Sequence, residues 1–237
     1  MSHKVHPKSF RIRRTKDWDS RGFYEKDFPS YLEEDFKIRK FLEKKIGKLG
    51  VEKIEIERSS GKVNIIISTA RPGLIIGRGG EGVEKLKRDL ENSILNKKKS
   101  LWGKKTVPSS KSSKKSKTDL KIEIREIRNP WTSASLVGQW MAGQIERRVR
   151  YRRVLKRSLS EVMAQKGVKG ARVEVKGRLD GIEISRREWL KEGRLPRQTI
   201  RAHIDYAYTR AYCSYGVVGI KVWIYKGERK EVKEDNQ

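Results

Sequence analysis

Five glycines lie within residues 71–82, RPGLIIGRGGEG, and the arginine Arg78 stands among them. Glycine at this density indicates backbone with positive φ or backbone that approaches a ligand closely. Phosphate is the first ligand to consider, because backbone N–H groups at such loops can donate hydrogen bonds to it. Three kinds of site use glycine in this way: a dinucleotide-binding loop, the phosphate loop of nucleotide hydrolases and a clamp on single-stranded nucleic acid.

The two nucleotide-binding interpretations fail on the residues around the glycines. Residues 77–82 match GxGxxG in letters, but a dinucleotide site needs a parallel strand before the loop and an acidic residue about 20 positions after it. Lysines occupy residues 97–99, and the segments before the loop read as an antiparallel hairpin. The hydrolase loop needs Gly-Lys-Ser/Thr, which does not follow at the required spacing. We therefore expect no nucleotide cofactor.

The remaining interpretation is a GXXG turn between two helices, as in a K-homology (KH) domain. Two glycines let such a turn lie flat against a nucleic-acid backbone, while helix-terminal N–H groups and a basic residue face phosphate. The turn consists of Gly77, Arg78, Gly79 and Gly80. The alternative is a glycine-rich surface turn that contacts no ligand.

A second candidate site lies in residues 145–157, IERRVRYRRVLKR, which hold seven Arg or Lys and one Glu. Helical spacing predicts one basic stripe formed by Arg148, Arg152 and Lys156, with Arg153 and Arg157 beside it. Like charges at this spacing disfavour an isolated helix by about 0.2–0.5 kcal/mol per pair, so we expect an anion to face the stripe. Ile145, Val149 and Leu155 can form the opposite, buried side. A solvated basic surface is the alternative.

A third basic set follows toward the C-terminus, with Trp189 among its arginines. It consists of Arg178, Arg186, Arg187, Arg194, Arg197 and Arg201. Arginine suits RNA because its planar guanidinium binds phosphate with two hydrogen bonds and stacks on bases. Trp189 is either a core residue or a stacking platform, and a structural salt bridge within a strand is the alternative for Arg201.

The composition favours a polyanionic partner. The chain of 237 residues carries 58 Lys and Arg against 30 Asp and Glu, a formal net charge of +28. Only 35% of the residues are apolar, which fits two domains better than one deep core. No apolar run approaches the ~20 residues of a membrane-spanning helix, and the N-terminus lacks the apolar segment of a secretory signal. The single Cys213 fits the reducing cytoplasm.

Residues for catalysis or metal binding do not group in the sequence. The three histidines have no ligand partners at metal spacing, and no Ser/His/Asp or paired-carboxylate arrangement stands out; the histidines are His3, His6 and His203. We therefore expect no catalytic residues, no metal, no cofactor, no small-molecule substrate and no membrane partner.

Hydrophobic periodicity places these candidate sites on helices and loops. A helix reaching Gly50, a β-hairpin, the glycine turn, a helix near 80–95 and a strand at 120–127 follow the order of a type II KH domain. After Asn129-Pro130 come helical patterns at 132–148 and 150–166, then short strands and two long strands. The predicted organisation is a basic arm over residues 1–30, a KH domain over 31–128 with a disordered Lys/Ser-rich insertion at 97–117, a C-terminal α/β domain over 129–228 and a polar tail over 229–237.

Several long segments resemble the family of small ribosomal subunit protein three, bacterial type. They are KVHP, TARPGLIIGRGGEGVEKLK, QIERRVRYRRVLKR, VKGRLDGIEISRREWLKEGRLP and IDYAYTRAYCSYGVVGIKVWIYKGE. The resemblance covers residues 3–228 apart from the 97–117 insertion. It implies an α+β fold, a type II KH domain followed by a C-terminal α/β domain with a mostly antiparallel sheet.

The resemblance also implies a structural role in the small-subunit head, near the mRNA entry channel in the cytoplasm. The partners would be small-subunit rRNA, mRNA and neighbouring ribosomal proteins of the head and entry channel. The motif matched by YRRVLKR would line the channel and assist mRNA unwinding through Arg152, Arg153 and Lys156. We expect rRNA contacts from Arg147, Arg148, Arg178, Arg186, Arg187, Arg194 and Arg197.

This sequence departs from the family pattern at the glycine turn, where relatives usually have two basic residues and this chain has Arg78 followed by Gly79. The 97–117 insertion is also longer than the usual connection. A KH-type RNA-binding regulator outside the ribosome is the alternative function, and cosedimentation with small subunits would distinguish the two. An enzyme with a nucleotide cofactor is a more distant alternative.

Overall fold

The computed structural model divides the chain into two compact units. The first unit is Asp19–Ile127, and the second combines Met1–Trp18 with Arg128–Gln237. The structure describes residues 5–12, 18–23, 28–59, 62–92 and 119–228. The predicted 97–117 insertion and the 229–237 tail lie outside these residues.

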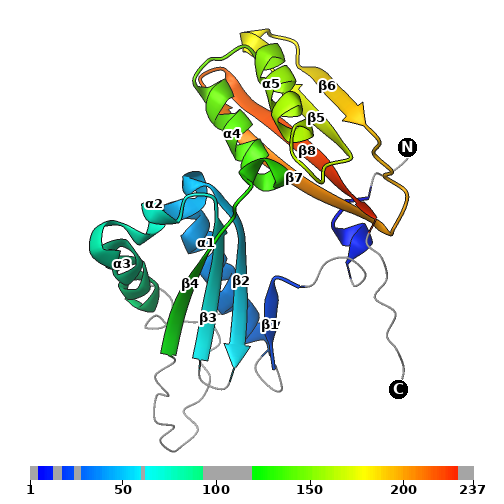
Figure 1. Ribbon diagram of the computed structural model, residues 1–237. Helices are drawn as coiled ribbons and strands as arrows, with labels where there is room; N and C mark the ends of the chain where they lie inside the picture. Colours follow the sequence, from blue (N-terminus) through cyan, green and yellow to red (C-terminus); the bar gives the residue numbers. More distant parts are fainter. Residues whose placement is uncertain (1–4, 13–17, 24–27, 60–61, 93–118, 229–237) are drawn as a thin grey trace, which may run out of the picture. The chain divides into compact units, whose positions relative to one another are not determined.

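The first unit has the element order predicted for a KH domain. Its helices are α1 (Phe28–Ile46), α2 (Pro72–Ile76) and α3 (Glu81–Leu90), and its strands are β1 (Ser20–Gly22), β2 (Val51–Ser59), β3 (Lys62–Thr69) and β4 (Asp119–Glu126). The strands form one sheet in the order β1-β2-β3-β4 (Figure 1). The β2–β3 pair is the predicted antiparallel hairpin, whereas β1 runs parallel to β2 and β4 parallel to β3.

The core of the first unit forms where α1 packs on the sheet. Ile38, Leu42 and Ile46 lie on one side of α1 and are buried with apolar residues of β2, β3, α2 and α3. Leu32 and Phe36, which share the helical apolar spacing in the sequence, lie on the outer side of α1 and are 57% and 64% exposed. A helical period alone does not decide which of two adjacent apolar stripes is buried.

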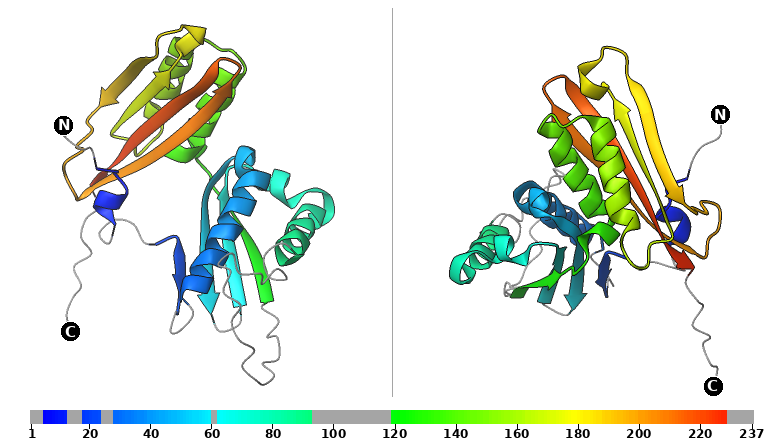
Figure 2. Two further views of the ribbon diagram at one scale, coloured as in Figure 1. Left: turned by 180° about the vertical axis from the view of Figure 1, so that it is seen from behind. Right: turned by 45° about the horizontal axis from the view of Figure 1, so that its top comes forward.

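The second unit is a four-stranded sheet with two helices on one face. Its elements are α4 (Ala134–Glu146), α5 (Tyr151–Met163), β5 (Gly170–Gly177), β6 (Arg186–Gly193), β7 (Ala202–Cys213) and β8 (Gly216–Glu228). All pairings are antiparallel, in the order β6-β5-β8-β7. α4 packs on β7 and β8, and α5 on β5 and β6 (Figures 1 and 2). Among the described residues, neither α-helix of this unit covers the opposite face (Figure 2).

Strand boundaries in the second unit differ from the sequence prediction. The sequence GIEISRREWL predicts a strand over residues 181–190, but Leu179–Gly181 form a 3₁₀ turn and β6 begins at Arg186. Asp180 has φ +54 in this turn, a conformation that ends the extended chain. Arg201 precedes β7 and is therefore not a strand residue.

The predicted arm over residues 1–30 is not one element in the structure. Arg11 is 2% exposed in the second unit, whereas β1 joins the sheet of the first unit and α1 already begins at Phe28. The guanidinium of Arg11 donates to the carbonyls of Ala202 (2.9 Å), Arg197 (2.9 Å) and Thr199 (3.0 Å). These bonds compensate for burial of the charged group, because arginine can donate five N–H bonds.

Candidate nucleic-acid interface

Three glycines set the backbone of the GXXG turn between α2 and α3. Gly77 has φ +72, Gly79 φ +60 and Gly80 φ +85, a region that residues with a Cβ rarely adopt. α3 then begins close against α2, since a Cβ on Gly82 would lie 2.5 Å from the Ile75 carbonyl oxygen. The predicted helix–turn–helix arrangement is therefore present, and its shape depends on glycine.

The charge at this turn is small. Arg78 is exposed at its tip, and the first turn of α3 carries Glu81 and Glu84. Carboxylates there stabilise the helix N-terminus but repel phosphate that approaches the same N–H groups. Glu84 is also paired with Arg88 at 3.3 Å, so that cation is partly engaged. The turn therefore offers RNA mainly its backbone.

The second candidate site is interrupted where the sequence predicts a continuous basic stripe. α4 ends at Glu146, and Arg148 has φ +63 in the turn before α5. The N–H groups of Arg148 and Val149 donate to the carbonyls of Ile145 (2.9 Å) and Gln144 (3.1 Å), which closes this turn. Placing Arg148 on one helical stripe with Arg152 and Lys156 was wrong, because the chain changes direction between them.

The remaining basic residues form a regular surface on α5. One side of α5 is buried against the core through Tyr151, Val154, Leu155, Ser158, Leu159 and Val162. The opposite side is exposed and is here named the α5 basic face; it consists of Arg152, Arg153, Lys156 and Arg157. Because the helix is anchored by its buried side, the four cations have a fixed spacing.

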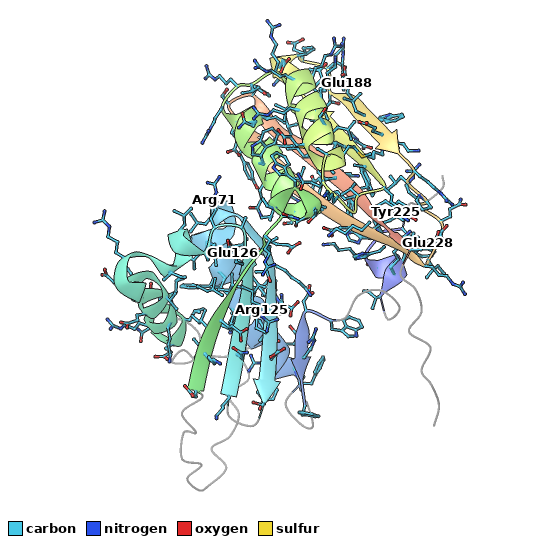
Figure 3. All side chains as sticks on the ribbon, viewed as in Figure 1. Arg71, Arg125, Glu126, Glu188, Tyr225 and Glu228 are labelled. Carbon is cyan, nitrogen blue, oxygen red and sulfur yellow. The ribbon has the colours of Figure 1, made fainter. Side chains whose placement is uncertain are left out.

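Neighbouring groups hold two of these cations while leaving them exposed. Glu188 lies on β6 (Figure 3). Tyr151 donates its hydroxyl proton to Glu188 at 2.7 Å, and Arg152 Nε donates to Tyr151 Oη at 3.1 Å. Hydrogen bonds with Tyr151 and Glu188 raise the pKa of Arg152, whose side chain is still 73% exposed. The guanidinium carbon of Arg157 lies 5.6 Å from the centre of the Trp140 ring.

Arg153 and Lys156 are the least restrained cations of the face. Within the described residues neither has an ion-pair partner. Arg153 borders a small surface pocket of about 240 Å³ together with Trp140, Val149 and Arg157. Two cations and an aromatic ring at one pocket can hold phosphate and a base together.

The other predicted arginines are exposed but do not form one site. Arg147 and Arg148 lie in the α4–α5 turn, Arg186 and Arg187 on β6, and Arg178, Arg194 and Arg197 in loops of the second unit. Two of them have structural partners. Arg178 donates to the carbonyls of Ile182 and Tyr215, both at 3.2 Å, and Arg187 contacts both carboxylate oxygens of Glu174 at 2.8 Å.

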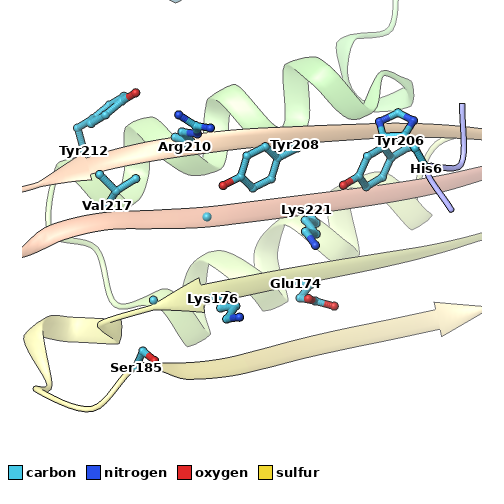
Figure 4. Close-up of a pocket in the computed structure, with 12 residues that line it drawn as sticks. His6, Glu174, Lys176, Ser185, Tyr206, Tyr208, Arg210, Tyr212, Val217 and Lys221 are labelled. Carbon is cyan, nitrogen blue, oxygen red and sulfur yellow. The ribbon is translucent and has the colours of Figure 1, made fainter. Parts of the chain in front are cut away.

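The helix-free face of the second unit's sheet contains candidate residues that the sequence reasoning missed. Tyr206, Tyr208, Arg210 and Tyr212 lie on this face of β7 (Figure 4). For Trp189 the sequence allowed either a core residue or a stacking platform; the side chain is 50% exposed. The guanidinium carbon of Arg172 lies 4.3 Å from the centre of its ring. The alternation of Tyr and Arg along residues 206–212 was the available signal, but it also fits an ordinary amphipathic strand.

The described residues contain no group of three or more His, Cys, Asp or Glu side chains suited to a metal ion. Among the same residues, no helix combines the length and apolar character needed to cross a membrane. Cys213 is a free, partly buried thiol next to the core of the second unit.

Comparison with known proteins gives matches over both units. Residues 37–132 match the KH domain family, and residues 141–224 match the family described as ribosomal protein S3, C-terminal domain. Small ribosomal subunit protein uS3 of Maridesulfovibrio salexigens is 47% identical over 229 residues, which are 96% of each chain. The uS3 protein of Oleidesulfovibrio alaskensis is 45% identical over 96% of each chain. That of Lawsonia intracellularis is 42% identical over 99% of this chain and 100% of its own length.

Proposed function

The chain belongs to the family of small ribosomal subunit protein uS3, and we propose that it binds small-subunit rRNA in the subunit head and lines the mRNA entry channel there. As a member of this family it is a ribosomal protein with a structural role and not an enzyme. Its other partners in this proposal are neighbouring ribosomal proteins of the head, within cytoplasmic ribosomes.

The observation that carries the mRNA proposal is the α5 basic face. Arg152, Arg153 and Lys156 project from one exposed side of a helix whose other side is buried. Contacts from such side chains to phosphate do not depend on base sequence, which suits a channel that must accept every message. Their fixed spacing lets several phosphates bind at once without reordering the protein.

Assistance to unwinding then requires no chemical step by this chain. The cations bind the phosphates of strands that have just separated and so disfavour their re-pairing. Translocation by the ribosome supplies the work that moves the message. In this mechanism Arg153 and Lys156 contribute most to phosphate binding, because Arg152 forms an ion pair with Glu188 that offsets part of its positive charge.

Exposed arginines elsewhere in the second unit are proposed rRNA ligands. They are Arg147, Arg148, Arg178, Arg186, Arg187, Arg194 and Arg197. Arg178 and Arg187 are oriented by bonds within the protein, which leaves only part of each guanidinium for phosphate. For the GXXG turn we propose a weaker contact, made by its backbone N–H groups and Arg78.

The test is translation by ribosomes that carry the triple variant Arg152→Ala, Arg153→Ala, Lys156→Ala. We expect normal incorporation into small subunits but slower translation through a stable mRNA hairpin, because the phosphates of the opened strands lose their ligands. The measurement is the ratio of elongation times on a hairpin message and an unstructured message. An unchanged ratio would contradict the channel proposal.

A matched control removes the same charge elsewhere. Lys40, Lys44 and Lys85 are exposed on helices of the first unit, so their triple alanine variant also lowers the net charge by three. It should leave the hairpin ratio unchanged. Failure of the wild-type chain to cosediment with small subunits would favour an RNA-binding regulator outside the ribosome.

A further inference from the structure

The helix-free face of the second unit's sheet carries a row of aromatic rings. Tyr206, Tyr208, Arg210 and Tyr212 alternate along β7 and therefore share one face of the strand (Figure 4). Tyr208 is 50% exposed and Tyr212 65% exposed. Both rings stand on a regular, paired strand, so their positions are fixed by the backbone and not by a loop.

Tyr208 leans across the neighbouring strand at Gly219. A Cβ on Gly219 would lie 3.2 Å from both Cε2 and Oη of Tyr208, so a larger residue there would displace the ring by a few tenths of an ångström. The guanidinium of Arg210 is 5.6 Å from the centre of the same ring. Hydrogen bonds to Tyr208 and Tyr212 raise the pKa of Arg210. The three side chains therefore form one connected surface.

These residues border a shallow groove of about 870 Å³ across β7, β8 and β5 (Figure 4). The charged residues that line it are Arg210, Lys176, Lys221 and Glu174. Glu174 is 4% exposed and accepts hydrogen bonds from Arg172 at 3.0 Å and Arg187 at 2.8 Å. Burial acts to raise the pKa of Glu174, but the two arginines outweigh it and lower the pKa. The groove therefore presents three cations and one already neutralised acid.

The N-terminal segment closes one end of the groove. The His6 ring meets the Tyr206 ring edge-on, with centres 4.9 Å apart and planes at 85°. Tyr206 is only 8% exposed, so it is not available for stacking. The accessible rings are consequently Tyr208 and Tyr212, toward the other end of β7.

We propose that this groove binds unpaired rRNA nucleotides, whose bases stack on Tyr208 and Tyr212 while their phosphates contact Arg210, Lys176 and Lys221. The proposal rests on the proposed ribosomal function, because it names rRNA as the ligand. Aromatic rings on an open sheet bind splayed-out bases by stacking, and nearby cations hold the connecting phosphates. The site lies on the sheet face opposite α5 and is therefore separate from the α5 basic face.

Charge complementarity favours RNA over a protein segment in this groove. A peptide that covered the tyrosines would have to be acidic to compensate for three cations, and it would leave the exposed π-faces without a flat partner. A run of unpaired nucleotides supplies both negative charge and flat rings at once. An acidic protein segment is the competing occupant, and the experiment below separates the two.

The test compares small subunits reconstituted with the wild-type chain and with the double variant Tyr208→Leu, Tyr212→Leu. Leucine keeps apolar bulk but removes the stacking surface. Chemical probing of rRNA bases should then show a discrete set of unpaired bases that gains reactivity by at least about fivefold, the low end of the effect of losing one stacked base. The matched variant Tyr208→Phe, Tyr212→Phe keeps both rings and should keep the protection.

Two further results decide the matter. Ultraviolet crosslinking of wild-type subunits should attach rRNA to the peptide that contains Tyr208 and Tyr212; absence of this crosslink would overturn the proposal. Unchanged base reactivity in the leucine variant, or loss of a neighbouring protein without a change in rRNA, would overturn it too, the latter in favour of protein docking. If the wild-type chain does not enter subunits, the proposed ribosomal function itself is contradicted.

Discussion

The GXXG turn and the α5 basic face both lie at the start of a helix, yet they present different chemistry to RNA. The turn has three glycines with positive φ, one exposed cation in Arg78, and acidic residues in the helix that follows. The α5 basic face has four exposed cations on a helix anchored by its buried side. The turn is therefore a feature of backbone shape, and the helix is a feature of charge.

The comparison separates two signals that the sequence presents together. Glycine density marks a place where the backbone needs a special conformation, whereas dense charge marks an expected anion. Charge alone is not sufficient evidence, because some arginines of this chain stabilise the fold. Arg58, with a side chain that is 8% exposed, donates to Asp35 at 2.6 Å and Glu34 at 3.0 Å within the first unit. Exposure of the cation distinguishes the α5 basic face from such residues.

The largest effect should come from Gly82→Val, which tests whether the turn depends on backbone shape. The new side chain would collide with the carbonyl oxygens of Ile75 and Ile76, which are 2.5 and 2.8 Å from a Cβ at this position. We expect a loss of about 3 kcal/mol in the stability of the first unit. Hydrogen exchange of amides in the two units should show faster exchange in the first unit alone.

Gly143→Ala provides the matched control in α4, where a Cβ meets nothing within 4 Å. Alanine in a helix with open space should stabilise the second unit by about 0.5–1 kcal/mol. Equal exchange rates in Gly82→Val and wild type would show that α2 and α3 can separate without cost. The claim that close packing of α2 and α3 sets the shape of the GXXG turn would then be wrong.

The next effect concerns RNA affinity of the purified chain. The triple variant Arg152→Ala, Arg153→Ala, Lys156→Ala should bind a single-stranded RNA about tenfold more weakly at moderate salt. The slope of log affinity against log salt should fall by about 2, since each lost phosphate contact contributes about 0.7. The free energy of unfolding should change by less than about 1 kcal/mol, because the three side chains are exposed and the pairing of Arg152 with Glu188 lies on the surface. An unchanged slope would mean that RNA does not contact this face.

Gly79→Lys tests the turn from the opposite direction, by adding the charge that it lacks. Space is open around Gly79, but its φ of +60 should make any side chain cost about 1 kcal/mol of stability. We expect roughly twofold tighter RNA binding and a salt slope steeper by about 0.7. Gly79→Ala should show the same loss of stability without the change in slope. A slope that does not change in the lysine variant would show that the turn stays away from phosphate.

Local patterns in the sequence predicted the parts of the fold that depend on local structure. The GXXG turn followed from glycine spacing. Helical periodicity gave the two faces of α5 in part, since Leu155 is buried while Arg153 and Lys156 are exposed. Ile145 and Val149, predicted for the same buried side, lie on α4 and in the turn before α5. The order of elements in the first unit was predictable for the same reason. These features involve residues within a few positions of one another.

Features that depend on distant residues or on a conformational exception were not predictable. Arg11 resembles any basic residue of an arm, and its carbonyl partners lie as far as 191 positions away. The sequence predicted a break between two helices near residue 149 but not its position, because α4 already ends at Glu146 and Arg148 adopts φ +63 without the glycine that usually marks such a turn. The open tyrosine face was also missed, because alternation along a strand does not show which side the helices cover.

The smallest effect should come from Glu188→Gln, which sharpens the difference between a free and a shared cation on α5. Glu188 lies 3.5 Å from Arg152 Nη2, so neutralising it should release Arg152 and tighten RNA binding by less than about threefold at low salt.

The same variant has a defined pH dependence. The hydrogen bond from Tyr151 and, to a smaller extent, the contact with Arg152 lower the pKa of Glu188. Its carboxylate is therefore ionised at neutral pH and becomes protonated only as the pH falls through the lowered folded value. The difference in RNA affinity between variant and wild type should accordingly persist at pH 5 and disappear only in acid below the ordinary range of a glutamic acid. If the affinity difference vanished well above pH 5, Glu188 would not be the group that restrains Arg152, and Arg152 would be as available to RNA as Arg153 and Lys156.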